Sequence, residues 1–462
     1  MKVSPFYITR RSILLIILTV LISFIAGISF LVVPSYFSPV YILAGIIVVV
    51  LFFVFLKKPI WAIYLAIFVA LLPASLIPAQ INSYLNRSSI VIALLVWVID
   101  VINRRSRINI TTSTLLLGLF IVWAAISLLW AEYFSEGVSI LQRYILRLVL
   151  FLLLIVNEVR TKMNFNGLMN TLAVSGGLLV IVSLFTILKQ GYSIGDRLQV
   201  LDVNENELGI SLILTLPAVF WWSIRPTTKP FQLIKKIIAI SYLLASIGLI
   251  GLSGSRGSAL SLGIMLFMFL LWKPTRFLGI FSLLIIGVSF IITPIIFSTT
   301  ISRFLEAAGE ASLGGREYIW PVAWQLIKEH PILGIGIGNS PYQMIPFLAY
   351  AGIIKLGFLS VNEISIHNPI LVIWAETGLP GLLLYVGVLV SAIISFSRQF
   401  LFSRKIHEDY LMPYFAIVSS MFIGYMAHWI KGGGLESDYS YFLVLALLLI
   451  PSQVQLGNSQ NS

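Results

Sequence analysis

The 462-residue chain contains no cysteine and little charge of either sign. The absence of cysteine excludes disulfide bonds, thiolate metal sites and a cysteine nucleophile. Aspartate, glutamate, lysine and arginine together make up 10% of the residues, whereas a soluble domain usually carries about 25%. With so few charged side chains, the chain cannot cover a soluble core with a polar surface.

Recognisable metal and nucleotide motifs are also missing. The sequence has no His-x-x-x-His, no Asp-x-Asp and no carboxylate cluster with ligand spacing. The Gly334-Ile-Gly-Ile-Gly338 run follows no predicted strand and opens no βαβ unit, so it is not a dinucleotide fingerprint. We therefore expect neither a metal nor a cofactor.

Hydrophobic residues make up 59% of the chain, and the mean hydropathy of the chain is +1.00. A helix that crosses a bilayer needs about 20 mostly apolar residues. About fourteen runs meet or approach this length: 12–33, 39–56, 60–79, 88–102, 112–131, 138–157, 168–188, 207–224, 236–252, 257–272, 276–297, 367–396, 410–430 and 438–451. The fourth and fourteenth runs are short. We predict an all-α polytopic membrane protein with about 12–14 transmembrane helices.

The start of the chain and its charge distribution indicate the topology. The first run follows basic residues, as in a signal peptide, but exceeds an h-region of roughly 7–15 residues, so it should remain uncleaved. The net charge of +12 is spread in small groups between the runs, which argues against a nucleic-acid partner. Alternate connections carry at least two lysines or arginines each. The positive-inside rule then predicts an inner (plasma) membrane protein with both termini cytoplasmic.

One predicted extracytoplasmic connection, residues 298–366, is much longer than the others. Within it, Arg316 to Glu329 has apolar residues at three- and four-residue spacings, which predicts an amphipathic helix. We expect this helix to lie along the outer membrane surface. The chain is therefore divided into about eleven helices over 1–297, a periplasmic loop over 298–366 and about three helices over 367–462, within a single membrane domain.

Four residues on the predicted outer side carry useful chemistry: Arg197, Arg256, Arg316 and His367. The planar fork of arginine donors suits phosphate and pyrophosphate. A neutral histidine can act as a general base toward a hydroxyl. Together they suggest a site for an anionic lipid-linked donor and an alcohol acceptor. The plainer alternatives are headgroup contacts for the arginines and a helix cap for His367.

Three further ionisable residues lie within predicted spans. Arg143 and Arg147 are one helical turn apart, and two like charges at this spacing are unfavourable without a counter-ion. Either they face the same cavity, or they pair with Glu132, Glu136 or another buried carboxylate. Glu376 follows His367 by nine residues, about half a rotation round a helix, so it should point away from the histidine.

Several of these segments resemble the bacterial O-antigen ligase and polymerase family. The resemblance covers about residues 190–390 and rests on their order, their spacing and the large outer loop. The motifs are Ser253-Gly-Ser-Arg-Gly257, Arg316 followed by Trp320, His330-Pro-Ile-Leu-Gly-Ile-Gly-Ile-Gly338, and His367-Asn-Pro-Ile-Leu with Glu376-Thr-Gly-Leu-Pro-Gly381. One stretch departs from the family: Asn204-Glu-Asn206 stands where Asn-Pro-Asn is usual.

The resemblance implies a metal-independent membrane glycosyltransferase of the GT-C type. Such an enzyme takes a glycan from undecaprenyl pyrophosphate and joins it to an acceptor sugar hydroxyl on the periplasmic side. Arg197 and Arg316 would hold the donor pyrophosphate, and His367 would activate or position the hydroxyl. Arg256 lies in a family motif. With Arg143 and Arg147, it completes the candidate donor-binding set.

Three hypotheses of function stand at this point, and the first is the glycosyltransferase just described. Its acceptor is a lipid A core, a growing polymer, a protein or another polymer, so that both a ligase and a polymerase are possible. A multi-span solute transporter is the second hypothesis, although no paired internal repeat supports it. A non-catalytic scaffold of an envelope-assembly complex is the third. Membrane lipids are expected partners in every case.

Overall fold

The protein is helical throughout the part of the chain that its computed structural model describes. That part comprises residues 51–72, 79–104, 108–190, 198, 205–292, 301–302, 316–350, 365–405, 411–430 and 439–450, with no strand among them. The helices are α3 (Pro59–Ala70), α4 (Ala79–Arg104), α5 (Thr112–Ser127), the 3-10 turn η3 (Leu128–Trp130), α6 (Phe134–Leu148), the π-helix η4 (Val149–Leu154), α7 (Ile155–Glu158), α8 (Lys162–Gln190), α9 (Glu205–Ile224), α10 (Lys229–Ser253), α11 (Arg256–Leu271), α12 (Arg276–Ile292), α14 (Arg316–Glu329), α15 (Ser340–Tyr350), α16 (Pro369–Lys405), α17 (Met412–Trp429) and α18 (Tyr439–Leu449).

Seven of the described helical segments are long and apolar enough to cross a membrane. They are Tyr84–Asn103, Thr112–Trp130, Phe134–Glu158, Lys162–Lys189, Glu205–Ile224, Lys229–Ser253 and Pro369–Lys405. Shorter apolar helices add to them, among them α3, α11 and α18. The expected all-α polytopic membrane protein is confirmed. Residues 1–50, which hold the first predicted span and most of the second, lie outside the described part.

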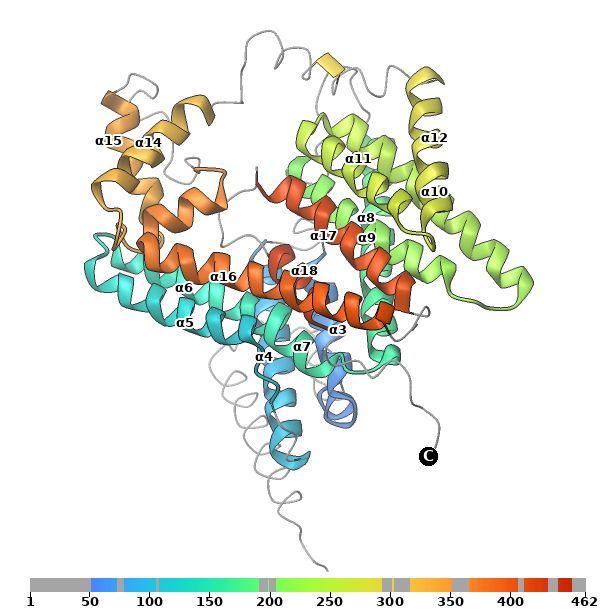
Figure 1. Cartoon of the computed structure of the whole chain (residues 1–462), viewed down its shortest axis with the longest axis horizontal. Coiled ribbons are helices and arrows are strands. Elements are labelled where there is room, and N and C mark those ends of the chain that lie inside the picture. Colours follow the sequence, from blue (N-terminus) through green and yellow to red (C-terminus); the bar gives the residue numbers. More distant parts are fainter. Residues whose placement is uncertain are drawn as a thin grey trace, which may run out of the picture.

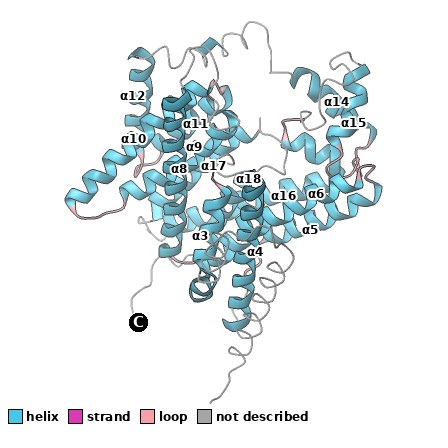
Figure 2. Ribbon diagram, turned by 180° about the vertical axis from the view of Figure 1, so that it is seen from behind, coloured by secondary structure: helices cyan, strands magenta, loops and turns pink. Residues whose placement is uncertain are grey.

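The helices surround a buried centre formed by α17 and α18. Figure 1 shows these two between α8–α11 on one side and α5, α6 and α16 on the other. The opposite view in Figure 2 also places α18 in the middle. All of α18 after its first residue is buried, as expected of a helix that is apolar all round. Tyr385 of α16 stacks on Trp429 of α17 and Tyr441 of α18, so aromatic rings join the three helices.

Two spans contain irregular turns. The span Phe134–Glu158 passes from α6 into the π-helix η4 directly after Leu148. Helix α16 is broken at Gly378, whose φ of 67° and ψ of −170° are not helical. A Cβ atom at this position would lie 1.9 Å from the carbonyl oxygen of Ile332, so only glycine fits. The single span predicted over 367–396 therefore consists of two helical parts.

Helices α14 and α15 stand beside the N-terminal part of α16, at one end of the molecule (Figure 1). The helix predicted from Arg316 to Glu329 is confirmed with the same bounds. Its inner face consists of Ala323, Leu326 and Ile327, which are buried, whereas Trp324 is exposed. This end of the molecule holds Arg316 and His367 among the candidate site residues.

Candidate active site

His367 precedes α16 in an unusual backbone conformation. It is the only non-glycine residue with positive φ among those described, at 52°. The left-handed region costs an ordinary residue roughly 1–2 kcal/mol, and such strain often accompanies functional sites. The helix cap belongs to its neighbour, because the Asn368 side-chain oxygen accepts from the backbone N–H groups of Ile370 and Leu371 at 3.0 and 3.2 Å. The alternative of His367 as a helix cap is therefore wrong.

Arg316, the first residue of α14, lies close to His367. The guanidinium acts electrostatically on the imidazole, and both burial and this charge lower the pKa of His367 below its ordinary value, with burial the larger cause. The two segments are also joined directly, because the Trp320 indole N–H donates to the carbonyl oxygen of Ile366 at 3.0 Å. His367 is therefore a neutral imidazole at neutral pH, next to a fixed cation.

The 330–338 segment, which we call the glycine turn, fills the break in α16. The backbone N–H groups of Ile335 and Gly336 donate to the carbonyl oxygens of Ala375 and Glu376, each at 2.9 Å. In the opposite direction, the N–H of Leu379 and the indole N–H of Trp374 donate to the carbonyl oxygen of Pro331. The break leaves backbone carbonyl groups of α16 without partners in their own helix, and N–H groups of the glycine turn donate to them. Two motifs of the outer region are thus one structural unit.

Glu376 connects this unit to α15. The buried carboxylate accepts from the backbone N–H of Gly338 at 2.9 Å, the N–H of Ser340 at 3.3 Å and the Ser340 hydroxyl at 2.7 Å. Ser340 begins α15, where the helix dipole favours a negative charge. Glu376 therefore anchors a helix start and the glycine turn.

Arg256 begins α11 at a closely packed junction of three helix ends. Ser255 caps α11 and donates to the Asn206 side-chain oxygen in the first turn of α9 at 2.7 Å. Helix α10 ends beside it at Gly254, in the left-handed conformation. The backbone N–H of Leu198 donates to Leu252 at 3.0 Å. Arg197 lies outside the described residues, but its neighbour Leu198 is fixed at this junction.

Arg147 in α6 has a counter-ion in the first turn of α9. The Glu207 carboxylate lies close enough to interact electrostatically with the Arg147 guanidinium. The two glutamates considered earlier have other partners: Glu132 accepts from Gln343, and Glu136 interacts with Tyr342. For Arg147, the alternative of pairing with a buried carboxylate stays a prediction, because Glu207 has an exposed side chain. No local sequence signal pointed to this interaction between Arg147 and Glu207.

Arg143 makes a different contact. Its Nε donates to the Ser139 carbonyl oxygen of its own helix, at a long 3.4 Å. Helix α6 begins beside the glycine turn, because a Cβ at Gly137 would lie 2.7 Å from the Ile337 carbonyl oxygen. Arg147 lies ten residues further on, about 15 Å along the helix.

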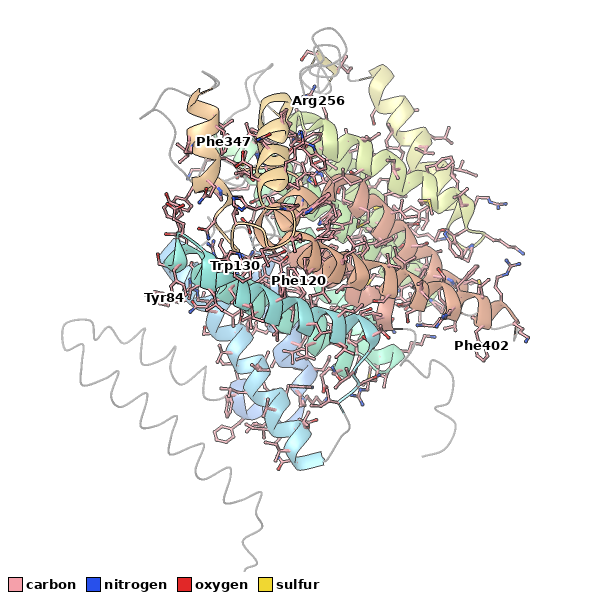
Figure 3. The ribbon with its side chains drawn as sticks, turned by 60° about the vertical axis from the view of Figure 1, so that its left-hand side comes forward. Tyr84, Phe120, Trp130, Arg256, Phe347 and Phe402 are labelled. Carbon is pink, nitrogen blue, oxygen red and sulfur yellow. The ribbon has the colours of Figure 1, made fainter. Side chains whose placement is uncertain are left out.

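In Figure 3, Arg256 of α11 and Phe347 of α15 lie near the top, whereas Phe402, near the C-terminal end of α16, lies far below.

Among the described residues, no group of three or more histidine, aspartate or glutamate side chains could hold a metal ion. The metal-independent reaction stays a prediction.

Comparison with known proteins agrees with the resemblance seen in the sequence. Residues 241–386 match a family model described as O-antigen ligase. The matched segment contains Arg256, Arg316, His367 and Glu376, but not Arg147. No curated protein matches the chain. The match covers less than half of the chain, and what it implies about the reaction is taken up in the next section.

Proposed function

We propose that this multi-pass membrane protein, whose residues 241–386 carry the O-antigen ligase match, transfers a glycan from undecaprenyl pyrophosphate to a sugar hydroxyl. The reaction takes place at the extracytoplasmic face of the inner membrane, with both termini cytoplasmic. The observation that supports the proposal best is the neutral imidazole of His367 beside the Arg316 guanidinium. A general base and an anion-binding group are what this transfer requires.

In the proposed step, the acceptor hydroxyl attacks the anomeric carbon of the donor sugar. A new bond forms between the acceptor oxygen and that carbon, and the bond between that carbon and the pyrophosphate oxygen breaks. His367 takes the hydroxyl proton. The pyrophosphate leaves with the bonding electron pair and gains negative charge, which Arg316 stabilises, together with Arg256 and Arg197.

The electrostatic interaction between Arg316 and His367 favours protonation of His367 after the donor pyrophosphate has bound, not before. In the free protein, Arg316 opposes protonation of His367 and keeps the base available. When a pyrophosphate occupies the space beside Arg316, its negative charge offsets the cation. Protonation of His367 then becomes easier as the leaving group develops charge. Binding of the donor would thus adjust the base for the step in which it accepts a proton.

The proposal is tested by glycan transfer in membranes that contain His367→Ala or Arg316→Ala. Both variants should insert at normal levels and lose transfer, and loss of the base alone should cost about 10²–10⁴-fold. Matched controls are His330→Ala and Lys328→Ala, which remove exposed side chains of the same region and should retain activity. Transfer at the wild-type rate by either site variant would refute the proposal.

The acceptor distinguishes a ligase from a polymerase. We favour the ligase, with a lipid A core as acceptor. A polymerase would use the same two groups, with a second lipid-linked glycan as acceptor. Lipid-linked material from a deletion strain separates them: long chains accumulate when a ligase is missing, and single repeats accumulate when a polymerase is missing.

A further inference from the structure

The glycine turn presents apolar side chains outward at the point where its backbone contacts α16. Ile332 and Leu333 are 64% and 50% exposed. Trp324 of α14 is also exposed, and its ring packs edge-on against Trp374 of α16, with centroids 5.4 Å apart. In water, such a tip would leave two large aliphatic side chains and a tryptophan unburied. The surface therefore needs an apolar partner.

This apolar tip continues a surface that already faces lipid. Exposed aliphatic residues recur along α16 at intervals of four and seven, which places them on one face of the span: Leu379, Leu383, Val390, Ile394 and Leu401. Leu379 starts this face, and its backbone N–H is bonded to Pro331, directly before Ile332. The exposed side chains of the turn thus extend the lipid-facing surface of α16 beyond its break.

Part of the backbone of the turn, on either side of Ile332 and Leu333, is bonded to protein. A non-helical segment is tolerated at membrane depth only where its polar groups are bonded to protein. The N–H groups of Gly334, Ile335 and Gly336 are all bonded, as is the carbonyl oxygen of Pro331. On the α16 side, the Thr377 carbonyl oxygen accepts from the Trp123 indole N–H at 2.7 Å.

We propose that the tip of the glycine turn, residues 331–333, inserts into the hydrocarbon of the outer leaflet as a shallow re-entrant element. Lys328, Glu329 and His330 are exposed directly before it and would lie at the headgroups, which limits the depth of insertion. Trp324 and Trp374 are placed as interfacial tryptophans. The His367–Arg316 pair then lies at the level of the bilayer surface, whatever reaction it serves.

The cysteine-free chain allows a direct test with single-cysteine variants of the full protein in phospholipid nanodiscs. Ile332→Cys and Leu333→Cys are the two variants that report on the tip of the glycine turn. Gln325→Cys, on the exposed polar face of α14, is the aqueous control, and Leu383→Cys, on the α16 lipid face, is the membrane control. Each is labelled with a charged maleimide to measure its rate, and separately with bimane to measure quenching by lipids that carry a doxyl group on the acyl chain.

Insertion predicts that bimane at 332 and 333 is quenched by doxyl lipids, as at 383. It also predicts that both cysteines react with the charged maleimide at least about tenfold more slowly than the one at 325, because the apolar environment raises the thiol pKa and each unit removes tenfold of the reactive thiolate. Reaction at the rate of position 325 without quenching would overturn the proposal. Slow reaction without quenching would also overturn it, since it would show that protein covers the tip.

Discussion

The imidazole of His367, directly before α16, lies within electrostatic reach of the guanidinium of Arg316, at the start of α14. A cation beside a buried histidine stabilises the neutral ring. The pair thus combines a proton acceptor with a group that binds anions, and its two members come from different helices.

Replacing Arg316 with glutamine should raise the pKa of His367 toward its ordinary value, because one of the two causes of the lowered pKa is removed. The measurement is a pH titration of nitrogen-15-labelled histidine resonances in nanodiscs, with His367→Asn to assign the signal. In the wild type, transfer should fall as the pH drops through the lowered pKa, since a protonated ring cannot accept a proton. Lys328→Gln should leave the titration unchanged. An unaltered His367 pKa in Arg316→Gln would contradict the interaction.

Trp320→Phe should lower the turnover rate with little effect on the level of folded protein. The substitution removes the hydrogen bond to Ile366, directly before His367, and frees the segment that holds the imidazole in its strained conformation. A net loss of about 0.5–1.5 kcal/mol corresponds to roughly 2- to 12-fold in rate. Trp374→Phe removes a similar bond, to Pro331 in the glycine turn, and should have a smaller effect on turnover. Equal losses of turnover in Trp320→Phe and Trp374→Phe would contradict the role of Trp320 in holding the His367 segment.

Glu376→Gln should destabilise the protein, because the amide places a donor group where the carboxylate receives three hydrogen bonds. Hydrogen bonds to charged groups contribute about 1.5–3 kcal/mol each, so the loss should appear clearly in thermal unfolding in detergent. Ser340→Ala removes one of the three and should be milder. The exposed Glu329, which accepts from Gln325, provides the control, and Glu329→Gln should change stability by less than about 0.5 kcal/mol. Unfolding of Glu376→Gln at the wild-type temperature would be contrary evidence.

Gly378→Ala should be strongly destabilising, because the added methyl group meets the Ile332 carbonyl oxygen and the backbone has a positive φ. Gly118→Ala in α5 is the matched control: its methyl group meets nothing within 4 Å, and alanine is favoured in a helix by about 1 kcal/mol. The two variants should therefore shift the unfolding temperature in opposite directions. A tolerated Gly378→Ala would mean that the α16 break can straighten.

Arg147 and Glu207 should behave as a coupled pair in a double-mutant cycle of Arg147→Met and Glu207→Gln. The double variant should recover part of the stability lost in each single variant, because no charge is then left without its counter-ion. Coupling between contacting groups is about 0.5–3 kcal/mol. Arg143→Met in place of Arg147→Met should show no coupling with Glu207. Additive effects of Arg147→Met and Glu207→Gln would argue against the pairing.

Local sequence patterns were sufficient to locate the helices. Apolar runs gave most of the described spans, and three- and four-residue spacing gave α14 with its observed bounds. The break at Gly378 within the span of α16 was not predicted. This break depends on contact with Ile332, some forty-five residues earlier, and a glycine inside an apolar run does not by itself signal such a break.

The sequence by itself determined that the protein is an all-helical membrane protein and which kinds of ionisable side chain it offers, because hydrophobic runs and residue types are local properties. Only the tertiary structure decided which of these side chains meet. His367 interacts electrostatically with Arg316, and Arg147 with Glu207. Glu376 accepts a hydrogen bond from Ser340 at the start of α15. These pairings depend on backbone hydrogen bonds and helix packing between distant segments, which the periodicity of a single segment does not encode.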